Sequence, residues 1–147
     1  MKEEKRQTKK IFVVLDTNVL VSALLTSNPF SPTAQIVEFL YKGILNPLYN
    51  EKILSEYKDV LNRKKFKFDS KLVDELVNTI EALGLNIKDT FQTDEVFPDP
   101  DDVVFYEVMM SIEDSYLVTG NLKHFPRKPF VVTPIQMVTI LKEKHLI

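Results

Sequence analysis

The sequence predicts an α/β fold with three layers, in which a mainly parallel central sheet is covered by helices on both faces. Two observations lead to this prediction. Short apolar runs typical of strands alternate along the chain with longer segments of helical periodicity, and such alternation is characteristic of βαβ units. In addition, residues 11–15 (IFVVL) are continuously apolar and rich in branched side chains, as is usual for parallel strands buried on both faces.

Length and composition indicate one domain with one core. The chain has 147 residues, of which 44% are hydrophobic and 27% charged, and chains usually divide only beyond about 250 residues. Residues 1–10 carry seven charged side chains, so we expect a flexible arm there and a single domain over residues 11–147. Because no apolar stretch approaches the roughly 20 residues that span a bilayer, and no signal-peptide pattern is present, we expect a cytoplasmic protein without membrane contact.

Composition also limits the chemistry of any functional site. The chain contains no cysteine, which excludes disulfides and thiolate metal sites, and its two histidines argue against a histidine-rich zinc site. A bound metal would therefore use oxygen ligands, which suit hard cations. The formal net charge of -2 gives no overall basic field, so a nucleic-acid partner would need a local basic patch.

The segment after the first strand predicts two helices. The first covers about residues 17–25. Ser31 is a suitable N-cap and Pro32 a suitable first residue for the second helix, which covers about residues 32–42. Gly43 should end this helix.

A second strand and a third helix are expected next. Residues 44–49 (ILNPLY) are a strand candidate that Pro47 interrupts. A helix over about residues 51–63 follows, because its apolar side chains recur with the spacing of one buried face. These side chains are Ile53, Leu54, Tyr57, Val60 and Leu61.

Asp69 or Ser70 should cap a fourth helix that ends at Gly84. Its expected buried stripe consists of Leu72, Val73, Leu76, Val77, Ile80 and Leu83. Residues 85–87 (LNI) are a further short strand candidate.

The last third of the chain contains the remaining elements. A turn-rich acidic segment, residues 94–102, precedes a helix over about residues 103–112, which is apolar nearly all round and should be buried on more than one side. Residues 116–120 (YLVTG) and 130–134 (FVVTP) predict two more strands. Pro134 then opens a terminal helix that extends to about Glu143.

The first strand ends on Asp16, and an acid in this position has two explanations. Aspartate is well suited to cap a helix that starts near Thr17. Alternatively, functional sites of open parallel sheets form outside the carboxyl ends of the strands, so Asp16 could belong to such a site. Because Thr17 or Asn18 could also supply the cap, the sequence leaves both interpretations open.

More acids occur where the predicted architecture would bring them near Asp16. Glu56 lies on the margin of the apolar stripe of its helix, from which it could reach a cleft, although an ordinary surface charge is the alternative. Asp99, Asp101 and Asp102 precede the buried helix, and three acids are more than a helix cap requires. Grouped carboxylates repel one another unless a cation or a proton compensates, so this surplus indicates a metal site.

The strand over residues 116–120 is followed by Asn121, and a Gly-Asn turn would explain these residues without any function. The alternative is that Thr119 and Asn121 complete the polar floor of the same site. Since all these positions fall at strand ends or helix starts, we favour one shared acidic site.

Several segments resemble the PIN-domain family, and within it the bacterial and archaeal group classed as toxins of toxin–antitoxin systems. The resemblance covers about residues 11–141. The order and spacing of its segments are more specific than any single aspartate. These segments are VVLDTNVLVSALL, LSEYKDVL, DPDDVVFYEV and YLVTGNLKHFP, followed by VVTP.

The resemblance implies a metal-dependent endoribonuclease that hydrolyses phosphodiester bonds of single-stranded RNA with Mg²⁺ or Mn²⁺. A bound cation lowers the pKa of an attacking water and offsets charge in the transition state, so no protein nucleophile is needed. Either Asp101 or Asp102 would be the third acid, and Asp99 is a lesser candidate. The candidate catalytic and metal-ligating residues are Asp16, Glu56, Asp101 and Asp102.

Three residues would support these acids: Asn18, Thr119 and Asn121. Family members often carry a fourth acid where this chain has Asn121. A neutral amide can still ligate or hydrogen-bond a metal-bound water, but the loss of one charge should weaken binding of a second cation.

Two basic segments offer contacts to RNA. Residues 63–68 (RKKFKF) interleave cations with aromatic rings, as phosphate pairing and base stacking require. The second segment, residues 122–128 (LKHFPRK), follows Asn121 and contains Lys123, His124, Arg127 and Lys128. We name Arg63, Lys64 and Lys65 in the first segment and Lys123 in the second as candidate RNA-binding residues. An ordinary solvated surface is the alternative, because basic residues commonly follow helix C-termini.

The resemblance further implies a cognate antitoxin protein as a partner and a homodimer. A PIN scaffold that binds RNA or a protein but cuts poorly is the alternative function. A phosphatase of the haloacid-dehalogenase type also places an aspartate after the first strand. That family needs a second aspartate two residues on, where this chain has Asn18.

Overall fold

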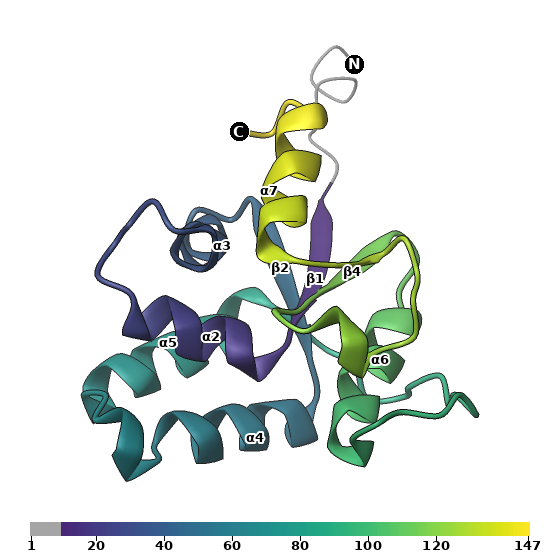
Figure 1. The fold of residues 1–147 in the computed structure, drawn as a ribbon, viewed down its shortest axis with the longest axis horizontal. Helices are drawn as coiled ribbons and strands as arrows, with labels where there is room; N and C mark the ends of the chain where they lie inside the picture. Colours follow the sequence, from purple (N-terminus) through teal and green to yellow (C-terminus); the bar gives the residue numbers. More distant parts are fainter. Residues whose placement is uncertain (1–9) are drawn as a thin grey trace.

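The computed structural model describes residues 10–147 and contains a five-stranded parallel sheet (Figure 1). Hydrogen-bonded neighbours follow the order β3-β2-β1-β4-β5. Apart from Lys10, the arm expected over residues 1–10 lies outside the described residues. The strands are β1 (Ile11–Leu15), β2 (Leu45–Tyr49), β3 (Leu85–Asn86), β4 (Ser115–Val118) and β5 (Val131–Val132).

Within residues 10–147, six α-helices and three short 3-10 helices connect the strands. The α-helices are α2 (Thr17–Leu25), α3 (Pro32–Tyr41), α4 (Glu51–Leu61), α5 (Ser70–Leu83), α6 (Val103–Met110) and α7 (Pro134–Glu143). The 3-10 helices are η1 (Lys64–Phe66), η2 (Pro100–Asp102) and η3 (Leu122–His124). None of the helices in the described part of the chain has the length and apolarity needed to cross a membrane.

Helices cover both faces of the sheet. Helix α6 packs on β1, β2 and β4, whereas α3 packs on β2 and also contacts α5 and α7. The predicted three-layer α/β/α fold with a parallel central sheet is therefore confirmed. Helices α2 and α4 begin directly after β1 and β2, so their first turns lie at the carboxyl end of the sheet (Figure 1).

Strand β1 is the central strand and aligns the residues that follow it. Val13, Val14 and Leu15 are at most 1% exposed, as expected of a strand covered on both faces. Leu15 is in register with Val118 of β4. The next residue continues this pairing, because the backbone N–H of Asp16 donates to Val118 O at 2.9 Å. The pairing brings the ends of β1 and β4 together.

The interruption expected at Pro47 does not occur, because β2 continues through this residue in register with Val13. Proline is tolerated there because the pairing of β2 with β3 begins only at Leu48, so the missing N–H breaks no bond on that side. Gly84 provides the space that Pro47 needs. A Cβ atom on Gly84 would lie 2.4 Å from Pro47 O and 3.0 Å from Pro47 Cγ.

Two helices end earlier than predicted, and one buried stripe is narrower. Helix α4 ends at Leu61 and helix α6 ends at Met110. On α5, Leu72 and Leu83 are 53% and 47% exposed, although both were expected in the stripe. The remaining four stripe residues, Val73, Leu76, Val77 and Ile80, are buried. Helical periodicity identified the centre of the packed face correctly but overestimated its width.

Candidate active site

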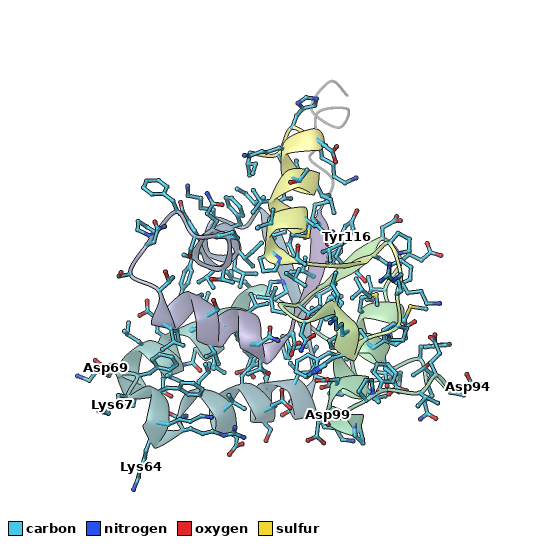
Figure 2. The ribbon with its side chains drawn as sticks, in the orientation of Figure 1. Lys64, Lys67, Asp69, Asp94, Asp99 and Tyr116 are labelled. Carbon is cyan, nitrogen blue, oxygen red and sulfur yellow. The ribbon has the colours of Figure 1, made fainter. Side chains whose placement is uncertain are left out.

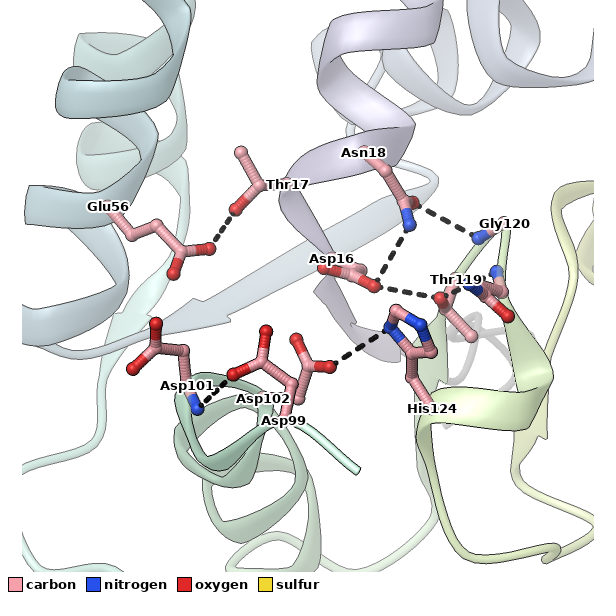
Figure 3. Close-up of polar contacts among 11 residues, drawn as sticks. Asp16, Thr17, Asn18, Glu56, Asp99, Asp101, Asp102, Thr119, Gly120 and His124 are labelled. Atoms are coloured by element: carbon pink, nitrogen blue, oxygen red, sulfur yellow. Dashed lines mark hydrogen bonds and ion pairs between the residues drawn. The ribbon is translucent and has the colours of Figure 1, made fainter. Parts of the chain in front are cut away.

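Asp16 occupies the N-cap position of α2, but its side chain forms no capping hydrogen bond. Instead, Asp16 Oδ2 accepts hydrogen bonds from Thr119 Oγ1 at 2.8 Å and from Asn18 Nδ2 at 3.2 Å (Figure 3). The residue is only 5% exposed. A carboxylate that does not cap its helix, and is held from both sides at the carboxyl end of the sheet, is available for another task.

The residues that hold Asp16 are themselves fixed. Thr119 is fully buried, and its Oγ1 also accepts a hydrogen bond from the backbone N–H of Asn121 at 3.0 Å. Asn18 Oδ1 accepts one from the backbone N–H of Gly120 at 3.1 Å. The start of α2 and the turn after β4 are thereby tied together, which restricts the orientation of the Asp16 carboxylate.

Glu56 reaches the same region from α4. Its Oε2 accepts a hydrogen bond from Thr17 Oγ1, and the residue is half-buried. The neighbouring Tyr57 is 1% exposed and donates its hydroxyl to the backbone oxygen of Leu15. This bond fixes α4 against the end of β1, so the position of Glu56 depends on a buried contact one residue away.

The three acids before α6 have different roles. Asp99 Oδ1 accepts a hydrogen bond from the backbone N–H of Asp101 at 2.9 Å, so Asp99 caps η2. Asp101 is exposed. The Asp102 side chain is 13% exposed, and its Oδ2 lies 3.2 Å from His124 Nδ1. This contact lacks hydrogen-bond geometry, so the buried Oδ2 accepts no hydrogen bond within the described residues.

Figure 3 shows that these carboxylates point toward a common space from three separate parts of the chain. We call the five residues together the acidic site: Asp16, Glu56, Asp99, Asp101 and Asp102.

Electrostatics within the acidic site disfavour the ionised carboxylates. Burial is the largest cause that raises the pKa of Asp16, of Glu56 and of Asp102, and for Asp102 the pKa rises to about 6. Neighbouring negative charges raise the pKa of Glu56 and of Asp102 further. Hydrogen bonds lower the pKa of Asp16 but do not cancel the effect of burial. A cation placed among these carboxylates would relieve this unfavourable energy.

The oxygen donors of the acidic site fit a hydrated hard cation better than a fully protein-ligated one. Among residues 10–147, no three Asp, Glu or His side chains are close enough to share one metal ion. Mg²⁺ does not require this, because it usually keeps several waters and is bound by one or two carboxylates. The buried Asp102 Oδ2, which accepts no hydrogen bond within the described residues, is a suitable ligand for such an ion.

The predicted RNA-binding residues lie in two different places, after α4 and in η3. Arg63, Lys64 and Lys65 follow α4, and Figure 2 shows Lys64 far from Asp99. In this basic turn the Phe66 and Phe68 rings stack with centroids 5.3 Å apart.

Lys123 belongs to η3, beside His124, which contacts Asp102 of the acidic site. It lines a cavity of about 610 Å³ between η3, β5 and α7. This cavity is lined mainly by apolar side chains such as Phe125 and Ile140, and none of the five carboxylates lines it. This cavity is therefore separate from the acidic site.

Two residues that contact the acidic site were not among the predicted site residues. Thr17 contacts Glu56, and His124 contacts Asp102. Thr17 follows Asp16 directly, which was a usable signal, but the sequence suggested only a capping role for it. His124 appeared as one of several basic residues in a surface segment, and its approach to Asp102 depends on how η3 packs.

Comparison with known families is consistent with this geometry. The PIN domain family model matches residues 12–123, well over half of the chain, and all five residues of the acidic site fall within the match. Neither the comparison with curated proteins nor the comparison with solved structures gives a match. PIN domains are generally metal-dependent nucleases with a nuclease-type fold. On the strength of the family match, the chain belongs to the PIN domain family.

Proposed function

We propose that this protein is an endoribonuclease that uses Mg²⁺ or Mn²⁺ to hydrolyse phosphodiester bonds of single-stranded RNA. One observation carries the proposal: Asp16, Glu56 and Asp102 face one another at the carboxyl end of the sheet, and each has a raised pKa. Such perturbed acids are characteristic of catalytic sites. Membership of the PIN domain family supports a nuclease over other metal-dependent hydrolases.

In this mechanism, Asp16, Glu56 and Asp102 would hold a hydrated cation, one or two of them directly and the rest through its waters. The bound cation would supply a water of lowered pKa and offset negative charge on the phosphoryl group. Thr119 and Asn18 keep the Asp16 carboxylate in place through their hydrogen bonds.

We further propose that the protein acts in the cytoplasm as the toxin component of a toxin–antitoxin pair, as a homodimer that a cognate antitoxin protein binds. This part of the proposal rests on the resemblance of the sequence segments to PIN-domain toxins. RNA contacts from Arg63, Lys64, Lys65 and Lys123 belong to the same proposal.

The alternative function is a weakly active or inactive PIN scaffold that binds RNA or a protein. Two observations favour it. Asn121 stands where relatives often have a fourth acid, which removes one negative charge from the neighbourhood of the cation. In addition, no three acids among the described residues are close enough to enclose a metal ion.

The deciding experiment compares wild type with Asp16→Asn on end-labelled single-stranded RNA in Mg²⁺, in Mn²⁺ and in EDTA. We expect wild type to cut in either metal and not in EDTA, and Asp16→Asn to lose about 100-fold or more of the rate. Asp74→Asn is the matched control, because Asp74 is exposed on α5, outside the acidic site. It should cut like wild type.

Circular-dichroism melts of all three proteins must first show that they are folded. If folded wild type cuts no RNA while it still binds RNA, the scaffold function replaces the nuclease. If Asp16→Asn cuts as fast as wild type, or EDTA has no effect, the acidic site is not the catalytic site.

A further inference from the structure

The cavity between η3, β5 and α7 has the size of a small-ligand site. Its volume of about 610 Å³ falls within the range of about 300–1,000 Å³ that is typical of such sites. The short helix η3 lies between this cavity and the acidic site: His124 contacts Asp102, whereas Leu122 and Lys123 line the cavity. The cavity is therefore a candidate binding site distinct from the acidic site.

Most of the cavity wall is apolar. Its lining includes Val132 of β5, Ile140 of α7 and Phe125. The Phe125 ring is fixed, because it packs edge-on against the Phe97 ring with centroids 6.1 Å apart. Leu122 also lines the cavity and is 40% exposed. Such a wall favours the apolar body of a ligand, whereas a nucleobase would find few partners there for the polar atoms of its edge.

The charged residues in the described lining of this cavity are all cations. They are Lys123, Arg127 and Lys128. This contrasts with the chain as a whole, in which acids outnumber bases and the formal net charge is -2. Lys128 Nζ lies 3.7 Å from a Glu95 oxygen, but Lys123 and Arg127 form no ion pair with any residue that the structure describes. Unpaired cations around an apolar cavity favour an anionic group on the ligand.

The segment that carries Arg127 is fixed before any ligand binds. Pro126 and Pro129 flank Arg127 and Lys128, and proline restricts its φ angle to one narrow range. The backbone N–H of Val131 donates to Lys128 O at 3.1 Å, which closes the turn. An anion beside Arg127 would therefore bind with little further loss of backbone entropy.

We propose that this cavity binds a small molecule that combines an apolar body with one anionic group, such as a carboxylate or sulfonate. Arg127 pairs with the anionic group, and Leu122 and Ile140 contact the apolar body. The inference goes beyond the proposed function and does not depend on it, because this site needs neither a metal ion nor RNA.

The test uses two fluorescent probes, anilinonaphthalene sulfonate (ANS) and phenylnaphthylamine (NPN). NPN has the same rings as ANS but no sulfonate, so the pair isolates the anionic group. Titrations in EDTA measure the affinity of wild type and of each variant for both probes. Arg127→Gln should weaken binding of ANS roughly three- to fivefold and binding of NPN by less than about 1.5-fold. Lys71→Gln, exposed on α5, is the matched control and should bind both probes like wild type.

Leu122→Ala tests the contact with the apolar body. Because this substitution removes apolar surface and no charge, it should weaken ANS and NPN by the same factor, roughly threefold. Leu72→Ala is its control, since Leu72 is 53% exposed on α5, and it should leave both affinities unchanged.

A uridine pentanucleotide tests the alternative that RNA occupies this cavity. A nucleobase inside the cavity would displace NPN, whereas RNA that contacts only the Lys123 ammonium group would leave the apolar interior free. We therefore expect NPN to stay bound in the presence of excess pentanucleotide. Displacement of NPN would assign the cavity to RNA and overturn the inference.

The remaining outcomes are equally decisive. A selective loss of ANS affinity in Arg127→Gln, together with a loss of both affinities in Leu122→Ala, supports the inference whether or not the protein cuts RNA. The inference is overturned if wild type binds neither probe, if neither variant changes binding, or if Arg127→Gln weakens both probes equally. Thermal melts must match wild type, because ANS also binds partly unfolded proteins. All four substituted residues are exposed, so we expect every variant to fold.

Discussion

Two acids beside α6 have opposite electrostatic surroundings. Glu95 is exposed and accepts a hydrogen bond from the Tyr106 hydroxyl at 2.6 Å, while its other oxygen lies 3.7 Å from Lys128 Nζ. The Tyr106 bond is the largest cause that lowers the pKa of Glu95. At the start of the same helix, burial and neighbouring acids raise the pKa of Asp102 to about 6, against the opposing effect of His124.

The difference distinguishes an acid that holds the structure together from one that is available for chemistry. Glu95 is matched by donors and connects its own loop to α6 and to the segment before β5. Asp102, Asp16 and Glu56 are crowded together, and no lysine or arginine among the described residues forms an ion pair with them. Such an arrangement costs stability, and unfavourable arrangements of this kind occur mainly where function requires them.

After the loss expected for Asp16→Asn, the largest effect should follow from removing the hydrogen bond that holds the Asp16 carboxylate. Thr119→Val keeps the shape of a fully buried side chain but removes the hydroxyl that donates to Asp16. Because partners of metal ligands are worth 10- to 100-fold in affinity or activity, we expect RNA cleavage to fall by about tenfold or more. The cleavage rate in Mg²⁺ measures it.

Two further variants show whether the hydroxyl itself is responsible. Thr119→Ser retains the hydroxyl and should retain most of the activity. Thr139→Val changes an exposed threonine of α7 and should have no effect on the rate. If Thr119→Val folds and cleaves at the wild-type rate, the orientation of Asp16 by Thr119 has no catalytic importance.

Asp102→Asn should raise the stability of the fold, which is a smaller effect than the loss of activity in Thr119→Val and opposite in sign. Asp102→Asn removes a carboxylate whose pKa rises from 3.8 in its ordinary state to about 6 in the folded protein. The folded state therefore binds the proton more tightly, so ionisation of Asp102 destabilises the fold as pH rises from about 4 to 6. Two pKa units correspond to about 3 kcal/mol, which solvent screening and the lost His124 contact reduce to about 1 kcal/mol.

Urea unfolding in EDTA at two pH values tests this. At pH 8 Asp102→Asn should be more stable than wild type, whereas at a pH below 3.8 the two should be equal, since wild type is then protonated. Asp74→Asn should show no such gain. A loss of stability at pH 8 would mean that the contact with His124 outweighs the repulsion among the acids.

The sequence predicted those features of the fold whose physical causes lie within one short segment, and it failed where the causes lie in distant residues. The buried run over residues 11–15 and the cap of α3 by Ser31 were predictable because one short segment contains the whole reason for each. Pro47 was misjudged because its tolerance depends on where the pairing with β3 begins and on the space left by Gly84, and both involve residues distant in sequence. The exposed Leu72 shows that periodicity identifies a helix face but not how much of it a neighbour covers.

The acidic site also combines features with local causes and features that depend on packing between distant segments. Asp16 and the acids before α6 were predictable from strand ends and from a surplus of carboxylates. The sequence did not reveal that Asp99 caps η2, because any of the three acids could have done so. Whether the acidic site holds a metal stays a prediction.

The smallest effect is expected at Glu95, the acid that holds the structure together. Tyr106→Phe removes the donor to Glu95 and should lower the melting temperature by only a small amount, on the order of 2 °C, because the acid is exposed. The pKa of Glu95 is lowered in the folded state, so this difference should be full above about pH 4.5 and shrink as pH falls further. RNA cleavage should stay at the wild-type rate, as it should in the exposed control Tyr41→Phe. A cleavage defect in folded Tyr106→Phe would show that Glu95 positions the acidic site through α6, and the two acids would then share one function.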